Sequence, residues 1–226
     1  MKDLGKFEGF TKKTFQFFND LGENNYKAWF DEHKPVYESE VLQPLKALVV
    51  AMTPGMYSID SQMDFRPNKV ISRIYRDIRF SKDKTPYKTH MWFTFQRITT
   101  NWECFPGFYM ELGAEGYQYG MGLFAPGKKN MDSYRSKIEY EQDNFKQITE
   151  KLISKQGYII GGEEYKRPTK NDLPEYFQPW IQRKSIYIFK KLPIGKELFN
   201  ADFAQYMVKE FTSLQPFYEF LVDVCE

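Results

Sequence analysis

"HMWFTFQRITTNWECFPGFYMELGAEGYQYGMGLF", residues 90–124, is the stretch that decides the fold. Apolar and polar side chains alternate in its first eight residues, which puts Met91, Phe93 and Phe95 on one face of an extended chain. "GFYMEL" and "GYQYGMGLF" are two further strand candidates, and the "GAEG" between them is typical of a tight hairpin connection. Three neighbouring strands with short links predict an antiparallel meander.

The segments before this stretch have the pattern of helices. Thr11 can cap a short helix with one apolar side, and the turn residues of "LGENN" are expected to end that helix. A longer helical region follows, in which apolar residues recur at steps of three and four. Proline lacks a backbone donor, so we expect a new segment at Pro35, a kink at Pro44 and an end within "TPGMYSID".

The segments after it alternate between helix and strand. A long helix is predicted from about Met131 to about Lys155, with Gly157 as its stop. "GYIIGGEEYKR" is interpreted as a small hairpin and "KSIYIFKKL" as another strand. The segment Asn200–Val224, near the end of the chain, is again predicted to be helical, with Pro216 dividing it.

Together these elements predict an α+β fold with N-terminal helices, a central, mainly antiparallel sheet and C-terminal helices. We find no internal repeat, low-complexity linker or step in composition. The sequence therefore favours a single α+β domain over residues 1–226.

The bulk composition limits the class of protein. The chain has 226 residues, of which 42% are hydrophobic and 27% charged, and a net charge of +2. A pI of about 8.3 is too mild for a chain that binds polyanions over its whole surface. Two distant cysteines, Cys104 and Cys225, fit a reducing compartment. With no signal-like apolar run near the start and no membrane-length segment, a cytoplasmic protein without membrane association is expected.

Positive charge is concentrated in "RIYRDIRFSKDKTPYK", residues 73–88, where six Lys and Arg residues face only Asp77 and Asp83. Arginines oriented by a neighbouring aspartate, here Asp77, suit phosphate or carboxylate, because the guanidinium fork matches two oxygens. The turn residues of "SKDKTP" can bond backbone amides and stiffen the exit. The alternative interpretation is a solvated loop with structural ion pairs, each contributing about 0–1 kcal/mol.

Other chemical motifs are weaker. Ser81 and Lys84 form an S-x-x-K pair, but Pro86 follows at once and the accompanying motifs of penicillin-binding enzymes are missing. His33 lies on an apolar helical face without a recognised ligand spacing, so a packed histidine is favoured and no metal site is predicted. Neither cysteine has a neighbouring base, which is typical of packing residues. The sequence does not identify a cofactor.

"ENNYKAWF", residues 23–30, is a second unusual stretch. Asn24 or Asn25 can cap the helix that follows. Their amides, together with the ring of Trp29, could instead line a pocket. Capping and packing are the preferred interpretation of these residues taken by themselves.

These two stretches resemble the motifs of a widespread family of bacterial and fungal proteins, the domain of unknown function numbered 2461. "NN..WF" and "R..RD.RFSKDK.PYK" are both intact, and "GYQYGMGLFAP" and "YKRPTKNDLPEYFQPWIQRKSIYIFKKL" are similar to later family segments. The resemblance covers about Phe7 to about Val222. It implies a single α+β domain and no particular activity. One departure is the bulky Met91, Trp92 and Phe93 after "PYKTH", where the family often has small residues.

The family motif is rich in charged and turn residues, which core packing does not explain, so a functional anion site is favoured. Candidate general bases are Asp77, Asp83 and Glu111. The candidate ligand-binding residues are Asn24, Asn25, Trp29, Arg73, Arg76, Arg79, Ser81, Lys82, Lys84, Tyr87 and Lys88.

Three functions remain open from the sequence. The leading hypothesis is a protein, or an enzyme, that binds a phosphorylated or carboxylated small molecule in a basic pocket. The second is a nucleic-acid-binding protein, in which basic residues follow phosphates and aromatic rings stack on bases. The third is a protein-interaction module without catalysis, which would have a sizeable apolar patch. No oligomeric state follows from the sequence.

Overall fold

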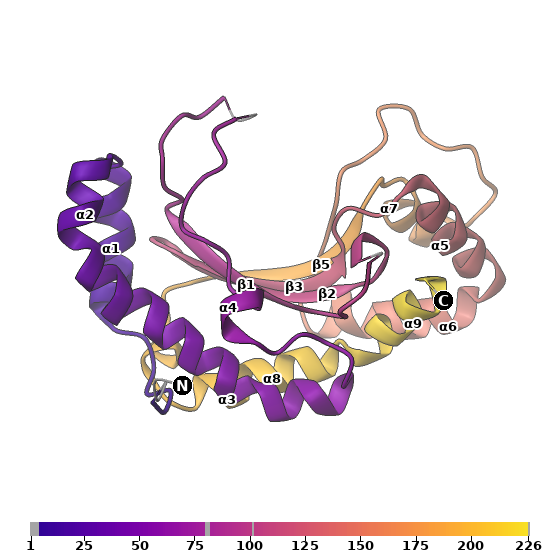
Figure 1. Cartoon of the computed structure of the whole chain (residues 1–226). Helices are drawn as coiled ribbons and strands as arrows, with labels where there is room; N and C mark the ends of the chain where they lie inside the picture. The colour runs from indigo at the N-terminus through magenta and orange to yellow at the C-terminus, as the bar shows by residue number, and fades with distance from the viewer. Residues whose placement is uncertain (1–4, 80–81, 101, 226) are drawn as a thin grey trace. The chain divides into compact units, whose positions relative to one another are not determined.

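The computed structural model describes residues 5–79, 82–100 and 102–225. Within these residues the sheet has five antiparallel strands in the order β1-β2-β3-β5-β4. Helices stand at both ends of the chain, so the predicted α+β class is confirmed (Figure 1). The strands are β1 (His90–Gln96), β2 (Gly107–Gly113), β3 (Gly116–Leu123), β4 (Ile159–Gly161) and β5 (Ile186–Pro193).

The helices fall into three runs along the chain. The first run is α1 (Lys12–Glu23), α2 (Lys27–Val36), the π-helical turn η1 (Tyr37–Leu42), α3 (Gln43–Ile59) and α4 (Pro67–Val70). The second is the short η2 (Trp102–Cys104), then α5 (Lys128–Tyr140), α6 (Gln142–Glu150) and the π-helical turn η3 (Lys151–Lys155). The third is η4 (Glu175–Phe177), α7 (Gln178–Ile181), η5 (Lys196–Phe199), α8 (Phe203–Ser213) and α9 (Gln215–Cys225).

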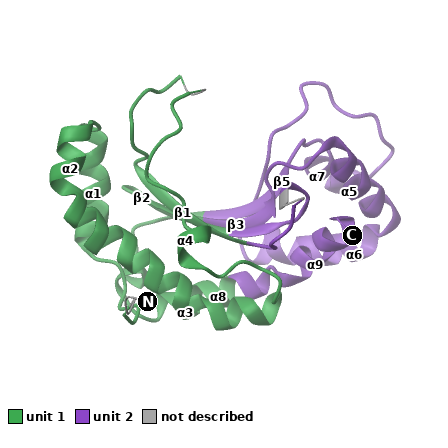
Figure 2. Ribbon diagram, viewed as in Figure 1, with its two compact units in different colours: residues 1–95, 109–118, 191–210 green, residues 96–108, 119–190, 211–226 purple. Residues whose placement is uncertain are grey.

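The chain divides into two compact units, coloured separately in Figure 2. The first unit comprises residues 1–95, 109–118 and 191–210, and the second comprises residues 96–108, 119–190 and 211–226. That all 226 residues form a single domain stays a prediction. In the described part of the chain, no helix is both long enough and apolar enough to cross a membrane.

The core of the first unit confirms the strand pattern predicted from the sequence. Met91, Phe93 and Phe95 of β1 are fully buried, and the residues between them are half-exposed. Burying a large apolar side chain contributes about 1.5–3 kcal/mol, and a slip of one residue would expose all three. The buried face of β1 therefore determines the register of this strand.

The N-terminal helix begins at the predicted cap. The Thr11 hydroxyl accepts from the Lys13 amide at 3.2 Å, and the Thr14 hydroxyl accepts from the Thr11 amide at 3.2 Å. These two bonds form a capping box, which satisfies backbone donors that have no partner within the helix.

The two prolines expected to divide the next helical region do not interrupt it: Pro35 lies in α2, Pro44 lies in the first turn of α3, and the π-helical turn η1 lies between them. α2, η1 and α3 follow one another without a break from Lys27 to Ile59. Pro44 has no N–H for the carbonyl of Glu40, and the Thr14 hydroxyl donates to that carbonyl at 2.7 Å instead. A wider turn and a side-chain donor thus replace the missing backbone bonds.

The predicted end of this helix within "TPGMYSID" is confirmed, and α3 continues through Pro54 and Gly55 as far as Ile59. A Cβ atom on Gly55 would overlap the side chain of Val208 in α8. Gly55 is therefore required for close helix packing, not for a turn.

The second unit has an aromatic core. The ring of Phe145 in α6 lies 5.1 Å from the rings of both Trp180 and Phe220. Phe108 in β2 lies 4.9 Å from the ring of Tyr218 in α9. These contacts tie α6, α7 and α9 together through edge-to-face and tilted pairs.

The predicted hairpin in "GYIIGGEEYKR" is wrong. β4 pairs antiparallel with β5, with Ile159 opposite Phe189 and Gly161 opposite Tyr187. The bridge between Glu164 and Arg183 continues the contact between these two segments. The pairing partner therefore lies more than twenty residues further along the chain, and the two glycines do not close a local turn.

Candidate functional site

The charged cluster lies on an extended arm of the first unit, of which residues 71–79 and 82–93 are described and which we call the basic arm. Its two sides pair through antiparallel bridges between Ile71 and Phe93 and between Tyr75 and Tyr87. The Lys88 amide donates to the carbonyl of Ile74 at 2.8 Å. Ile74 and Tyr87 are buried, so the base of the arm is anchored by packing while its charged side chains remain accessible.

Asn25 fastens the basic arm to the N-terminal helices. Its side-chain amide donates to the Tyr87 carbonyl and accepts from the Tyr87 N–H, both at 3.0 Å. The ring of Tyr87 also stacks on Phe30 of α2, with centroids 4.1 Å apart. The two family-like motifs, 62 residues apart, are thus joined by a pair of hydrogen bonds and a ring stack.

The prediction that Asn24 or Asn25 caps α2 is wrong. Tyr26 occupies that N-cap position and makes no side-chain capping bond. Asn24 instead donates to the carbonyl of Asp20 at 3.0 Å, at the end of α1. Of the two asparagines, Asn25 contacts the basic arm and Asn24 completes the preceding helix.

Trp29 packs against the rings of Phe17 and His33. Its ring stacks on His33 at 4.0 Å, with planes 10° apart, and Nδ1 of His33 lies 2.8 Å from the Trp29 carbonyl. This matches the packed, hydrogen-bonded histidine favoured by the sequence. The proposed ligand contact of Trp29 stays a prediction.

The two aspartates of the arm hold different arginines. Arg79 makes a bidentate pair with Asp77, with Nη2 2.6 Å and Nε 3.0 Å from the carboxylate oxygens. Arg76 Nη2 lies 3.2 Å from Asp83. Asp77 therefore forms its ion pair with Arg79, and the charge of Arg73 also acts on Asp77.

Hydrogen bonding lowers the pKa of both aspartates. The side-chain and backbone N–H groups of Arg79 lower the pKa of Asp77 to about 2. The backbone N–H and hydroxyl of Thr85 lower the pKa of Asp83, with a smaller contribution from the charge of Arg76. Both carboxylates are thus held ionised by neighbours, which is unfavourable for a general base that must accept a proton.

Arg73, Arg76 and Lys88 form a group of neighbouring cations. Lys88 Nζ donates to the Arg73 carbonyl at 2.7 Å and lies 4.3 Å from the centre of the Trp92 ring. Partial burial, followed by repulsion from Arg73 and Arg76, lowers the pKa of Lys88. The structure therefore holds three positive charges together, and only Arg76 has a recorded carboxylate partner among the described residues.

Two of these cations have nitrogen donors without an acceptor among the described residues. Arg76 Nε is buried and has no hydrogen-bond partner in the part of the chain that the structure describes. Within the same residues, no hydrogen bond or ion pair to the Arg73 guanidinium is present. An unpartnered buried donor costs about 1–3 kcal/mol, so an anion bound here would relieve both repulsion and desolvation.

The remaining predicted cations have other surroundings. Lys84 Nζ donates to the Ile78 carbonyl at 2.8 Å, which stabilises the tip of the arm. Lys82 is exposed. Ser81, which is also the serine of the S-x-x-K pair, lies outside the described residues. Its ligand-binding role stays a prediction.

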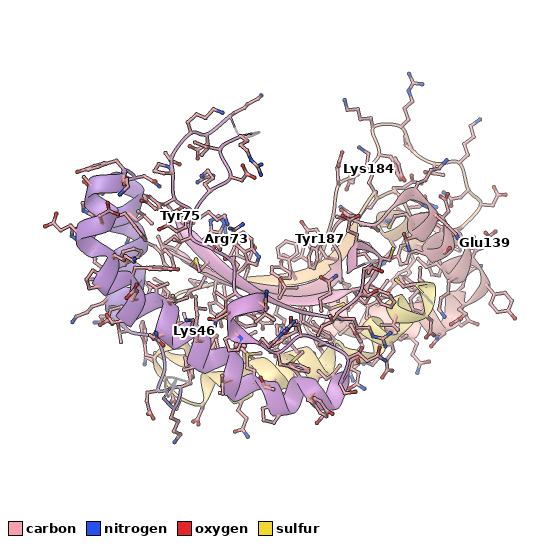
Figure 3. The ribbon with its side chains drawn as sticks, in the orientation of Figure 1. Lys46, Arg73, Tyr75, Glu139, Lys184 and Tyr187 are labelled. Carbon is pink, nitrogen blue, oxygen red and sulfur yellow. The ribbon has the colours of Figure 1, made fainter. Side chains whose placement is uncertain are left out.

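A cavity of about 320 Å³ lies beside Arg73, between the basic arm and the N-terminal helices. Its charged lining consists of Lys34, Glu38, Lys46 and Arg73, and Figure 3 labels Lys46 and Arg73. The other lining residues are Phe30, Tyr37, Leu42, Pro67, Asn68, Ile71, Ser72, Ile74 and Tyr75. This combination of apolar walls with a few polar groups, at this volume, is typical of a small-molecule site.

Sequence reasoning missed Lys34 and Lys46. Both lie on helices far from the arm in sequence and look like ordinary solvated lysines. Only the folding of the arm against α2, η1 and α3 brings them to the same cavity as Arg73. No local pattern could have identified them.

Glu111, the third candidate base, lies beside His90. Glu111 Oε2 is 3.9 Å from His90 Nε2, and its other oxygen accepts from Gln118 at 3.1 Å. The His90 ring lies 5.7 Å from the ring of Trp92, against which Lys88 packs. Both Glu111 and His90 are about one-third exposed, so this pair remains accessible near the cationic group.

No metal centre is evident in the described ranges, because no three His, Cys, Asp or Glu side chains there are grouped to hold an ion. Cys104 and Cys225 are both half-buried, and the Cys225 thiol contacts the Cys104 carbonyl.

The comparison with family models confirms the family resemblance predicted from the sequence. The model described as "Conserved hypothetical protein (DUF2461)" matches residues 13–220, nearly the whole chain. The fold thus defines the class as an α+β protein. The description of the matching family names no activity. The chain is a member of the DUF2461 family. A search of curated proteins found no match.

Proposed function

We propose that the protein binds a phosphorylated or carboxylated small molecule on the basic arm. The anionic group would lie on Arg73 and Lys88, and the rest of the ligand would occupy the 320 Å³ cavity. The single observation that carries this proposal is the position of Arg73, which lines the cavity and also belongs to the cationic group around Lys88.

The chemistry of these residues supports an anionic ligand. A guanidinium fork can donate to two oxygens of a phosphate or carboxylate, and a partly buried ammonium adds a point charge. Three adjacent cations repel one another, and this cost is recovered when an anion binds. Lys34 and Lys46 also line the cavity, where the carboxylate of Glu38 lies 3.9 Å from Lys34 Nζ.

If the bound molecule reacts, Glu111 is the best-placed candidate base. Asp77 and Asp83 are each engaged by N–H donors that keep them ionised. Glu111 has a histidine beside it and is accessible, an arrangement that supports proton transfer. The proposed ligand binding does not depend on whether the protein also catalyses a reaction.

Thermal unfolding of the wild type and an Arg73→Ala variant tests the proposal. The probes are inorganic phosphate, a sugar phosphate and a dicarboxylate. A probe at a hundredfold excess over its dissociation constant stabilises the folded wild type by about 2.7 kcal/mol. Arg79→Ala is the matched control, because Arg79 is an exposed arginine of the same arm that does not line the cavity.

The expected result is a rise in melting temperature for wild type and Arg79→Ala, and a much smaller rise for Arg73→Ala. Equal stabilisation of all three proteins, or of none, would contradict the proposal. A short single-stranded oligonucleotide in the same assay examines the nucleic-acid alternative. Binding that weakens steeply with salt would favour that alternative over a small ligand.

A further inference from the structure

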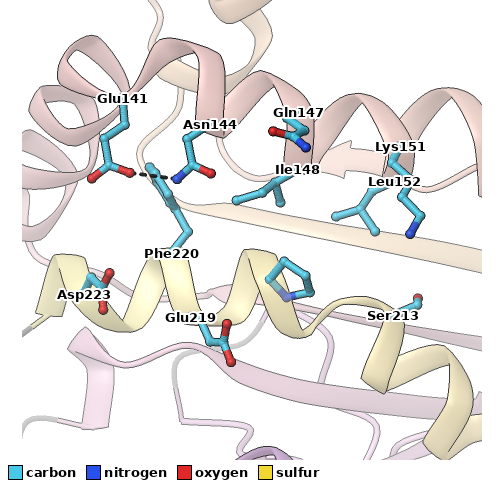
Figure 4. Close-up of a pocket in the computed structure, with 11 residues that line it drawn as sticks. Glu141, Asn144, Gln147, Ile148, Lys151, Leu152, Ser213, Glu219, Phe220 and Asp223 are labelled. Carbon is cyan, nitrogen blue, oxygen red and sulfur yellow. Dashed lines mark hydrogen bonds between the residues drawn. The ribbon is translucent and has the colours of Figure 1, made fainter.

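The second unit contains a larger cavity that is independent of the basic arm. It is a groove of about 500 Å³ between α6–η3 and α9, which we call the α6–α9 groove (Figure 4). Its lining residues are Glu141, Asn144, Gln147, Ile148, Lys151, Leu152, Ser213, Pro216, Glu219, Phe220 and Asp223. Every one of them belongs to a helix or a helix end, so the groove has no strand edge.

The middle of the groove is apolar. Ile148 and Leu152 are four residues apart, and Figure 4 shows them with Phe220 between the two helices. Pro216 adds a further apolar surface. Leu152 and Phe220 are almost fully buried, so they form a floor, whereas Ile148 is half-exposed.

One end of the groove is acidic. Glu141 and Asp223 share the ammonium group of Lys137, whose Nζ lies 3.2 Å and 3.1 Å from their carboxylates. Burial of Lys137 opposes its charge, but the hydrogen bonds to these carboxylates outweigh burial and raise the pKa of Lys137. Glu219 bonds to the Gln215 amide at 2.8 Å. The groove lining thus contains three carboxylates and one ammonium group, that of Lys151, while Lys137 pairs with two of the three carboxylates.

We propose that the α6–α9 groove binds a basic amphipathic helix of a partner protein. The apolar side of that helix would lie on Ile148, Leu152 and Phe220, and its Lys or Arg residues would face the acidic end. Glu219 and Asp223 are four residues apart on α9, so basic residues at the same helical spacing match them. Helices recognise grooves in this way through anchors at i, i+3, i+4 and i+7.

The dimensions of the groove fit this occupant. α9 has 11 residues, which corresponds to a length of about 16 Å or three helical turns. Lys151 and Ser213 lie at the end opposite Glu141 and Asp223 in Figure 4. The positive N-terminus of a bound helix dipole would therefore be favoured at the acidic end. An extended peptide would find no strand edge here to pair with.

The test uses a fluorescent peptide of about 15 residues, long enough to form a helix, with leucine along one face and lysine elsewhere. A scrambled peptide of the same composition keeps the charge but has no apolar face. The variant is Glu219→Gln/Asp223→Asn. Its matched control is Asp143→Asn/Glu150→Gln, which removes two exposed carboxylates of α6 that do not line the groove.

We expect the amphipathic peptide to bind the wild type about tenfold more tightly than the scrambled peptide, measured by fluorescence anisotropy. Glu219→Gln/Asp223→Asn should lose about tenfold in affinity, while the control pair should stay near the wild-type value. Amide NMR shifts should concentrate at Ile148, Leu152 and Phe220. Ile148→Lys, which places a charge at the half-exposed part of the floor, should also abolish binding without lowering the melting temperature.

Three results would overturn the proposal. These are equal binding of both peptides, equal loss in the two double variants, and no binding of the amphipathic peptide to the wild type. Equal loss would show that the peptide responds to overall charge and not to the groove. None of these outcomes affects the anion site, which lies in the other unit.

Discussion

The side-chain amide of Asn25 forms two 3.0 Å hydrogen bonds with the backbone of Tyr87, one to its N–H and one to its carbonyl. An asparagine amide can both donate and accept, so it can replace a neighbouring strand at this position. Asn25, which lies between α1 and α2, thereby holds the basic arm to the N-terminal helices.

Asn25→Ala should destabilise the protein by about 2–3 kcal/mol, because both backbone groups of Tyr87 lose their asparagine partner. Urea unfolding at constant m-value measures this change. Asn24→Ala is the control, since Asn24 makes one bond at a helix end and should cost about 1 kcal/mol. Equal losses in the two variants would mean that the link to the arm contributes nothing beyond local capping.

The pKa of Lys88 reports on the cationic group. Burial lowers this pKa first, and Arg73 and Arg76 lower it further. Arg73→Ala should therefore raise the pKa of Lys88 toward its ordinary value of 10.5. NMR titration of isotopically methylated lysines would detect the shift. Arg79→Ala should leave it unchanged, because Arg79 is not among the groups that perturb Lys88.

The same measurement with ligand present tests the anion site. A bound anion favours the protonated ammonium, so it should raise the pKa of Lys88. By linkage, affinity for the anion should then fall as the pH rises through the pKa of Lys88. An anion that binds without moving this pKa would bind somewhere other than at Lys88.

Asp77 should remain ionised to unusually low pH. Its folded-state pKa of about 2 is below the ordinary value of 3.8, so its pairing with Arg79 favours the folded form above pH 3.8. That contribution is lost as the pH falls from 3.8 through about 2. Carboxyl NMR should show the low pKa in the wild type and a return toward 3.8 in Arg79→Ala. A pKa near 3.8 in the wild type would show that the ion pair is not formed in solution.

The parts of the fold that were predicted correctly depend on local patterns. Alternation in β1 and the turn residues between β2 and β3 lie within a few residues of one another, so they are visible in the sequence. The pairing of β4 with β5 depends on residues far apart, and the glycines of "GYIIGG" led to a hairpin that does not form. At these glycines, long-range strand pairing determines the structure and local turn propensity does not.

The candidate site shows the same division. The density of charge on the basic arm was evident, but the assignment of Arg76 to Asp83 and of Arg79 to Asp77 was not. Asn25 was noticed for capping, whereas its partner lies 62 residues away. Side-chain pairing depends on how the arm folds back, and spacing along the chain does not contain that information.

Two helical glycines illustrate why propensity alone misleads. Gly22 in α1 has open space, because an added Cβ would approach only the Thr89 methyl group at 3.9 Å. In α3, an added Cβ on Gly55 would overlap Val208. Gly22→Ala should therefore stabilise the protein by about 0.5–1 kcal/mol, whereas Gly55→Ala should destabilise it by about 1–3 kcal/mol. Thermal unfolding of both variants measures the contrast. Stabilisation by both would mean that α3 and α8 can separate at little cost.

The hydroxyl of Tyr134 in α5 is buried and has no hydrogen-bond partner among the described residues. Burial raises the pKa of Tyr134, which keeps the hydroxyl neutral. Tyr134→Phe removes a desolvated polar group without opening a large cavity, so it should be neutral or stabilise by up to about 1 kcal/mol.

Tyr117→Phe is the matched control, because the Tyr117 hydroxyl donates to Glu197 at 2.9 Å. Losing that bond should cost about 1–2 kcal/mol and leave the carboxylate less well solvated. The free energies of unfolding of the two variants, measured with urea, should therefore change in opposite directions or differ by at least about 1 kcal/mol. A clear loss of stability in Tyr134→Phe would show that the hydroxyl bonds to an internal water, and it would place that water beside α5 in the core of the second unit.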